Sequence, residues 1–179
     1  IKAQEQIIAT RLEKRFSKRE IITMYLNQFD FLYNAVGIES AANVYYNKKA
    51  IELTKLEAAM LVGMCKNPSL YNPYSFKNKN YGSKIALKKN ISTSKVSQSE
   101  IKAARKKDST RAINRRNQVL FQWLRNSENE NEHLSSKLTR KEYELLCKKP
   151  LIVDYHSVDH KKGLAPYFRE SLKNEVNSI

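Results

Sequence analysis

The first side chain whose position suggests chemistry is Glu5. On a helix, which turns by roughly 100° per residue, Glu5 lies near the centre of an apolar stripe formed by Ile8, Ala9, Leu12 and Phe16. The stripe predicts that this carboxylate faces the inside of the protein. Ionised carboxylates are rarely buried without a partner, so Glu5 is expected either to pair with a cation or to stand in a cleft suited to acid/base work.

Lys2 provides the structural alternative. It stands one turn before Glu5 on nearly the same helix face, and opposite charges at this spacing attract each other. By spacing alone, an ion pair between Lys2 and Glu5 is the simpler explanation. A chemical role for Glu5 needs a more specific observation.

That observation is a series of motifs in a constant order. Lys2 to Ala9 is followed by Leu12-Glu13-Lys14, Ile21-Ile22-Thr23-Met24-Tyr25-Leu26-Asn27, Gly37-Ile38-Glu39-Ser40-Ala41-Ala42-Asn43-Val44-Tyr45-Tyr46, Asn67-Pro68-Ser69-Leu70-Tyr71-Asn72-Pro73 and Arg115-Arg116-Asn117-Gln118-Val119-Leu120. In order and spacing these motifs resemble those of the family 51 glycosyltransferases. Residues 164–170 resemble the segment that joins this domain to the transpeptidase domain of bifunctional class A penicillin-binding proteins.

The resemblance implies a fold and a domain organisation. We expect a mainly α structure, the C-terminal part of a lysozyme-like glycosyltransferase lobe, followed by a linker with little β structure toward a transpeptidase domain. The lobe would cover residues 1–126, with a basic, mobile insertion over 77–110. The linker and the start of the transpeptidase side would cover 127–179.

The resemblance also implies a reaction. Enzymes of this family polymerise lipid II into β-1,4-linked glycan strands and release undecaprenyl pyrophosphate, at the outer face of the bacterial cytoplasmic membrane. Lipid II and the growing glycan chain would be the partners, together with an anionic membrane surface and other cell wall synthesis proteins. Nucleic acid is not an expected partner in this reading.

Site residues follow from the same motifs. Glu5 would be the second catalytic carboxylate, placed near the leaving pyrophosphate, while Lys2, Asn27 and Ser40 would bind substrate. No cofactor is required, although a divalent cation, Mg or Mn, would suit the pyrophosphate. The family's first glutamate, the expected base, belongs to a motif that these 179 residues do not contain, so we expect the isolated chain to be inactive.

Three positions depart from the family's pattern. Ile1 stands where arginine is usual, which removes one expected phosphate contact. Leu32 and Asn47 replace common glycines and predict local changes of the backbone. Gly37 keeps its glycine, which is more typical of a tight turn than of a ligand contact.

Capping boxes predict the helices that must position these residues. A hydroxyl residue is followed by glutamate three positions later at Ser17-Glu20, Thr54-Glu57, Ser97-Glu100 and Thr139-Glu142. In this motif the hydroxyl and the carboxylate each accept a hydrogen bond from a backbone amide of the first turn. Helices are therefore predicted to begin near residues 18, 55, 98 and 140.

Composition guides the expectations for the remaining segments. Residues 77–109 are rich in Lys, Asn and Ser, which predicts a mobile segment with at most a short helix after Ser97. A separate helix is expected over 111–125, an exposed turn over 127–132, a strand at 151–153 and a last helix after 165–168. His133, His156 and His160 have no ligand spacing, and Cys65 and Cys147 form no metal or redox motif.

The charge leaves other functions open. Thirty-three Lys and Arg against eighteen Asp and Glu give a net charge of +15, which attracts polyanions. A basic helical module that binds nucleic acid is one alternative, although the basic residues are scattered along the chain, and a non-catalytic structural module is another. For an anionic membrane, we expect the helix face with Met60, Leu61 and Met64 to add apolar contact.

Overall fold

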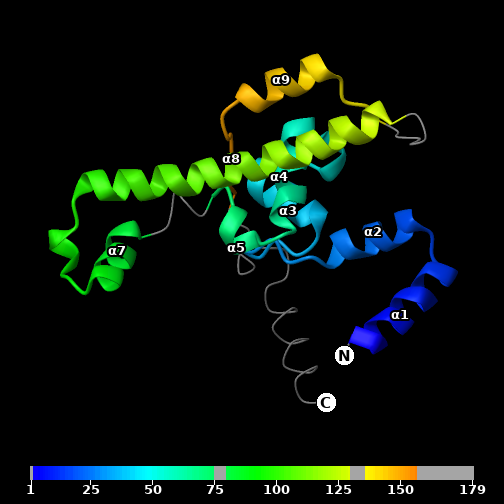
Figure 1. The fold of residues 1–179 in the computed structure, drawn as a ribbon, viewed down its shortest axis with the longest axis horizontal. Helices are drawn as coiled ribbons and strands as arrows, with labels where there is room; N and C mark the ends of the chain where they lie inside the picture. Colours follow the sequence, from blue (N-terminus) through cyan, green and yellow to red (C-terminus); the bar gives the residue numbers. More distant parts are fainter. Residues whose placement is uncertain (1, 75–79, 130–135, 157–179) are drawn as a thin grey trace, which may run out of the picture.

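Helices account for the regular secondary structure of the computed structural model, which describes residues 2–74, 80–129 and 136–156 (Figure 1). Within these ranges the only β pairing is an isolated bridge between Asp30 and Val36. The α-helices are α1 (Lys2–Arg15), α2 (Lys18–Gln28), α3 (Ile38–Tyr46), α4 (Lys55–Met64), α5 (Pro68–Tyr71), α7 (Tyr81–Lys89), α8 (Gln98–Glu128) and α9 (Arg140–Lys148), with short 3-10 turns η1 (Ala50–Glu52) and η2 (Thr93–Lys95). The mainly α character expected from the sequence is confirmed.

All four predicted capping boxes form. Helices α2, α4, α8 and α9 begin one residue after Ser17, Thr54, Ser97 and Thr139, respectively, and each box makes both of its hydrogen bonds. In the second box, for example, Thr54 N–H donates to Glu57 Oε2 at 2.8 Å, and Glu57 N–H donates to Thr54 Oγ1 at 3.4 Å. The predicted helix starts are therefore confirmed.

The core is organised by α4, which packs against α8. One buried cluster gathers side chains of α3, α4 and α8, such as Tyr45, Met64 and Ala112, and a second joins Ala59 of α4 to Leu120 of α8. The two helices approach closely at Gly63, where a Cβ atom would lie 3.3 Å from Arg115 Cγ. Met60 and Leu61, together with Met64, are buried in the first cluster, so the expectation that these three residues face lipid is wrong.

A buried arginine ties the end of α9 to α8. The Arg116 guanidinium is fully buried and donates to the carbonyls of Pro150 at 3.2 Å and Cys147 at 3.4 Å. It also donates twice to Asn117 Oδ1, at 3.0 and 2.9 Å. These acceptors include carbonyls at the C-terminal end of α9, where the helix dipole favours a cation.

Helix α8 differs from the expectation for its region. In place of a mobile segment and a separate helix over 111–125, one helix of 31 residues runs through to Glu128. Its N-terminal half is held by α7, because Tyr81 Oη donates to Asp108 Oδ2 at 3.0 Å and Arg105 lies over the Tyr81 ring at 5.9 Å. Helix continuity and these contacts override a composition that is poor in large apolar residues.

The expected strand at 151–153 is wrong, because this segment is extended without a strand partner. Asp154 N–H donates to Tyr45 O at 3.1 Å and His156 N–H to Val44 O at 2.8 Å, which satisfies carbonyls at the end of α3. Ile152 is 71% exposed, whereas Leu151 and Val153 pack on the core. The expected helix after 165–168, the second half of the turn expected at 127–132, and His133 and His160 lie outside the described residues. Ser127 and Glu128, expected in that turn, belong to α8.

The loop between α2 and α3 depends on left-handed backbone conformations. Leu32, Tyr33 and Asn34 have φ values of 67°, 55° and 65°, and Asn47 has 51° at the end of α3. The sequence predicted backbone changes where Leu32 and Asn47 replace glycine. The structure corrects this, because both residues keep a conformation that glycine favours, at a cost in strain for Leu32.

The first testable consequence concerns pH. Hydrogen bonds from the caps hold the pKa of Glu20 and Glu142 below the ordinary value, and Lys89 followed by the Ser97 cap lowers the pKa of Glu100. Hydrogen bonds from Lys48 and Thr54 outweigh the burial of Glu57 and lower its pKa as well. A carboxylate whose pKa is lower in the folded state than in the unfolded state stabilises the fold. This stabilisation is complete above the unfolded pKa of about 4.3, and it is lost as the pH falls through the folded pKa. We expect the melting temperature, followed by circular dichroism, to fall steeply below about pH 4.5.

The variant Glu57→Gln should have a lower melting temperature at neutral pH and a flatter dependence below pH 4.5. Glu144→Gln on α9 is the matched control, because this exposed residue caps no helix, and it should keep the wild-type profile. A wild-type slope in Glu57→Gln would contradict the assignment.

A second prediction concerns Gly37, which precedes α3 with φ 83° and ψ 156°. This conformation is nearly restricted to glycine, and a Cβ atom here would lie 2.6 Å from Asn27 O. Gly37→Ala should destabilise the chain by about 2 kcal/mol or more, measured by urea unfolding. Gly82→Ala is the control, since its nearest contact would be an ordinary 3.4 Å; a loss of stability as large as that of Gly37→Ala would refute this explanation.

Candidate functional site

The predicted site residues lie on a hairpin of α1 and α2 and on the start of α3. The two helices are joined by Phe16 and Ser17 and run in opposite directions, so the first turn of α1 and the last turn of α2 lie at the open end of the hairpin (Figure 1). Lys2 and Glu5 lie in the first turn of α1, and Asn27 lies in the last turn of α2.

Glu5 is exposed, which corrects the expectation that it faces the inside. The stripe around it is also open: Ile8 is 57% and Phe16 41% exposed, and only Leu12 is partly buried. The described part of the chain places no element over this stripe. An apolar stripe predicts burial only where a partner covers it, so the pattern alone could not establish where Glu5 points.

Lys2 and Glu5 are both available for contacts outside the chain. No ion pair joins them in the described residues, and both side chains are exposed. The structural alternative, a buried ion pair with Lys2, is therefore absent. Exposed ion pairs contribute little to stability in any case.

The loop between α2 and α3 brings the Asn27 backbone close to Gly37, which stands three residues before Ser40. Gly37 N–H donates to Phe29 O at 2.9 Å, and the Gly37 α-carbon lies against the Asn27 carbonyl. Phe29 is the C-cap of α2, and the exposed Asn27 side chain bonds to no described residue. Ser40, in the first turn of α3, is exposed as well.

A hollow between α1 and α2 adds residues that sequence reasoning did not select. It has a volume of about 440 Å³ and is lined by Leu12, Met24, Tyr25, Gln28 and Asp30, among others. The Tyr25 ring lies 5.4 Å from the Phe29 ring, tilted by 46°. The signal available in the sequence was the i, i+3, i+4 spacing of Ile21, Met24, Tyr25 and Gln28 on α2, which places these side chains on one face.

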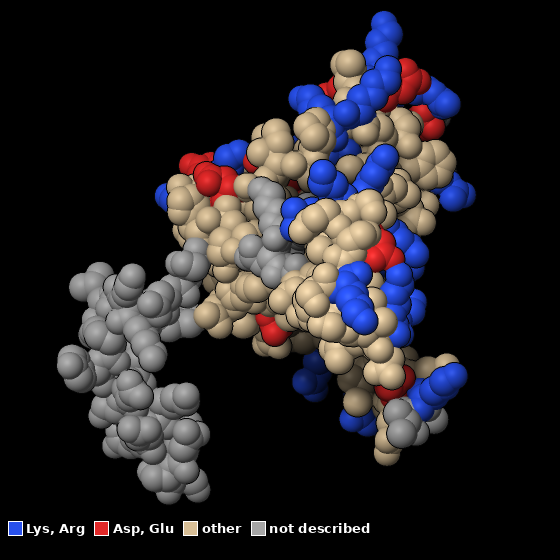
Figure 2. All heavy atoms as spheres, turned by 90° about the vertical axis from the view of Figure 1, so that its left-hand side faces the viewer, with Lys and Arg blue, Asp and Glu red and all other residues tan. Residues whose placement is uncertain are grey.

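The described residues do not suit a metal ion. Within them no group of three or more His, Cys, Asp or Glu side chains stands where it could hold one, so no step of a reaction is derived through a divalent cation. Likewise, no helix in the described ranges has the length and apolar character that crossing a membrane requires. Basic side chains spread over the right half of the face in Figure 2, with few acidic ones between them.

Several penicillin-binding proteins are similar to this chain in sequence. Penicillin-binding protein 1A of Haemophilus influenzae is 35% identical over 106 residues, 59% of this chain and 12% of the relative. Penicillin-binding protein 1F of Bacillus subtilis is 42% identical over 79 residues, 44% of this chain and 11% of the relative. Penicillin-binding protein 1A of Aquifex aeolicus is 29% identical over 175 residues, 98% of this chain and 18% of the relative. The chain thus spans less than a fifth of the length of these curated relatives.

The fold agrees with this relationship. The 2.6 Å crystal structure of penicillin-binding protein 1A from Haemophilus influenzae matches 89% of this chain and 17% of its own chain, with a TM-score of 0.50 and 25% identity. The family model described as Transglycosylase matches residues 1–95, more than half of the chain and the part that carries Lys2, Glu5, Asn27 and Ser40. The chain belongs to the transglycosylase family.

Proposed function

We propose that this chain is part of a peptidoglycan glycosyltransferase that polymerises lipid II during cell wall synthesis. The observation that carries the proposal is the family match over residues 1–95, the part of the chain that contains the motifs from Lys2 to Pro73. The alternatives drawn from charge, a nucleic-acid-binding module and a non-catalytic scaffold, have no comparable support.

The reaction requires a base for the acceptor proton and a positive charge beside the leaving pyrophosphate. The 4-hydroxyl oxygen of the acceptor attacks the anomeric carbon of the donor, the bond from that carbon to the pyrophosphate breaks, and the acceptor proton leaves to a base. The departing pyrophosphate gains negative charge, which a cation stabilises. In our proposal Lys2 contributes that positive charge, Glu5 orients the groups around the leaving group, and Asn27 and Ser40 hold substrate.

The described contacts support this assignment of roles. Lys2 and Glu5 are exposed and unpaired with each other, and the Asn27 amide is free to bond to a ligand. Glu5 is exposed and has no ion-pair partner among the described residues, so its carboxylate is accessible to a ligand. The glycine-dependent loop holds the end of α2 against the start of α3, which fixes Asn27 relative to Ser40.

We also propose the division into a lobe over 1–126, including the basic segment 77–110, and a linker over 127–179 toward a transpeptidase. Described residues on both sides of the proposed boundary share one core, since Leu138 packs with Leu124. The linker would therefore begin as a packed extension of the lobe.

The proposed location is the outer face of the cytoplasmic membrane. Since Met60, Leu61 and Met64 are buried, the apolar contact would come from the α1–α2 hairpin, where Ile7 and Ile22 are 54% and 50% exposed. Arg11, Lys14, Lys18 and Arg19 lie on the same two helices. Apolar and basic side chains together are typical of a surface that rests on anionic headgroups.

Glu5→Gln in the full-length parent enzyme tests the catalytic role. Because Glu5 is exposed and unpaired, the melting temperature should not change, while kcat for lipid II polymerisation should fall on the order of 10²-fold. Lys2→Ala should raise KM for the donor more than Glu5→Gln does, since its charge already binds the pyrophosphate in the ground state.

Glu144→Gln, an exposed carboxylate on α9, serves as the matched control and should leave both constants unchanged. A folded Glu5→Gln enzyme that polymerises lipid II at nearly the wild-type rate would show that Glu5 has no catalytic role.

Sedimentation with lipid vesicles tests the membrane surface. The chain should bind vesicles that contain phosphatidylglycerol more tightly than neutral ones at low salt, and the difference should shrink as salt screens the charges. The double variant Ile7→Ser/Ile8→Ser should weaken binding, whereas Leu87→Ser, which changes an 82% exposed leucine on α7, should not. Equal binding to neutral and anionic vesicles would contradict the electrostatic part.

A further inference from the structure

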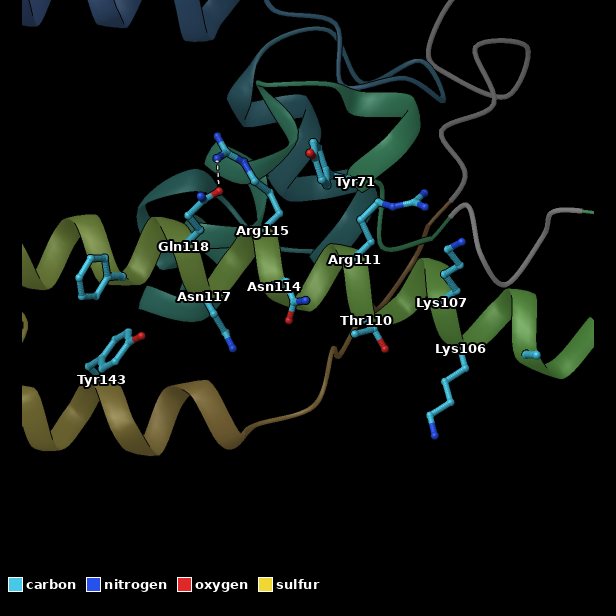
Figure 3. Close-up of a pocket in the computed structure, with 12 residues that line it drawn as sticks. Tyr71, Lys106, Lys107, Thr110, Arg111, Asn114, Arg115, Asn117, Gln118 and Tyr143 are labelled. Atoms are coloured by element: carbon cyan, nitrogen blue, oxygen red, sulfur yellow. Dashed lines mark hydrogen bonds between the residues drawn. The ribbon is translucent and has the colours of Figure 1, made fainter.

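A long basic groove runs along α8, between α5 on one side and α9 on the other (Figure 3). Its volume is about 970 Å³. Its floor follows α8 from Ala103 to Phe121, about 27 Å at 1.5 Å per residue. The groove lies apart from the first turn of α1, which carries Lys2 and Glu5 (Figure 1).

One half of the groove is positively charged. Lys106, Lys107, Arg111 and Arg115 line it, and no carboxylate does. Arg111 is held by Asp108 at 3.2 Å, and Arg115 donates to Gly63 O at 3.2 Å and lies over the Tyr71 ring at 5.8 Å. Lys106 and Lys107 are exposed and form no ion pair with a described residue. All four cations line the groove, Lys106 on the side of α9 and Lys107, Arg111 and Arg115 on the side of Tyr71 (Figure 3), and their combined positive charge favours an anion.

Uncharged hydrogen-bonding side chains alternate with the cations along α8. Thr110, Asn114 and Gln118 recur every four residues and so lie along one face of α8, about 6 Å apart. Gln118 Oε1 accepts from Arg115 Nη1 at 2.8 Å, which leaves its NH₂ group as a donor. The exposed side chains of Thr110 and Asn114 bond to no described residue. Hydroxyl-rich ligands suit such a row, because hydroxyls both donate and accept.

Aromatic rings close the other end. Phe121 of α8 is 48% exposed, and its ring lies 6.2 Å from that of Tyr143 on α9, at 57°. A ring face of this kind packs against flat, weakly polar surfaces, such as the C–H face of a sugar. Cations and uncharged polar groups therefore alternate along most of the groove, and the aromatic rings form an apolar platform at one end.

We propose that this groove binds an anionic glycan, a sugar polymer that carries carboxylate or phosphate groups. Double-stranded nucleic acid does not fit, since a duplex takes a helix into its own groove and here the helix is the floor. Single-stranded nucleic acid would favour aromatic rings along the whole path, whereas the rings that line this groove are Tyr71, Phe121 and Tyr143, and uncharged polar groups stand between the cations of α8. A single lipid headgroup would use only a small part of its length. The site is separate from the one proposed for polymerisation and does not involve Glu5.

Isothermal titration calorimetry with the 179-residue chain tests the proposal with four probes. The carboxylate source is a β-1,4 glycan of N-acetylglucosamine and N-acetylmuramic acid without stem peptides, and the phosphate source is a poly(glycerol phosphate) chain with sugar substituents. A neutral chitooligosaccharide and an oligothymidylate of matched length complete the set. We expect at least one anionic glycan to bind at least tenfold more tightly than both the neutral oligosaccharide and the oligothymidylate, and which of the two binds identifies the source of the charge.

Substitutions in the groove test whether the glycan binds there. Lys106→Glu/Lys107→Glu should weaken binding at least tenfold, and Asn114→Leu and Phe121→Ala several-fold each. Lys84→Glu/Lys88→Glu makes the same change of charge on exposed residues of α7 and should have little effect, and circular dichroism checks that every variant folds. The proposal is overturned if no glycan binds, if the neutral or nucleic acid probe binds as well as the anionic glycans, or if both charge-reversal pairs weaken binding equally.

Discussion

The close crossing of α4 over α8 at Gly63 is the contact on which the other packing depends. Without a Cβ on Gly63, the α4 backbone comes near enough for its carbonyl to accept from Arg115. Met60 and Met64 then reach one buried cluster and Ala59 the other. A wider separation would leave both clusters with gaps, and buried gaps are costly because the lining atoms lose their contacts.

The same crossing supports both the wall of the α8 groove and the loop beside Asn27 and Ser40. Arg115 is held between the Gly63 carbonyl and the Tyr71 ring, so the wall of the α8 groove is built from the α4–α8 contact. On the other side of the core, α3 packs on α4 and receives the loop that positions Asn27 and Ser40. The α1–α2 hairpin, by contrast, buries little of its apolar surface within the described residues.

Local signals in the sequence predicted local structure well. Each hydroxyl residue with glutamate three positions later marked a true helix start, because both hydrogen bonds of the box form within one turn. Gly37 was correctly assigned to a tight turn. The motif order was sufficient to identify the family.

Features that depend on distant partners were harder to predict. The composition of 77–109 could not show that Tyr81 and Asp108 would join α7 to α8. The apolar stripe beside Glu5 could not show whether anything covers it. The short β-branched run at 151–153 predicted a strand, but tertiary structure decides that the amides just after it, of Asp154 and His156, bond to the end of α3 instead. Leu32 adopts a glycine-like φ because the surrounding loop imposes it.

The extended segment after α9 also determines how the chain transmits force. Asp154 and His156 bond through their backbone amides to the last turn of α3, and Tyr155 between them stacks on Tyr74 at 3.6 Å. Tension applied to the chain beyond His156 would therefore reach α3 directly, before it could unwind α9. A domain pulled or turned at that end would move α3, and with it Ser40, as one body.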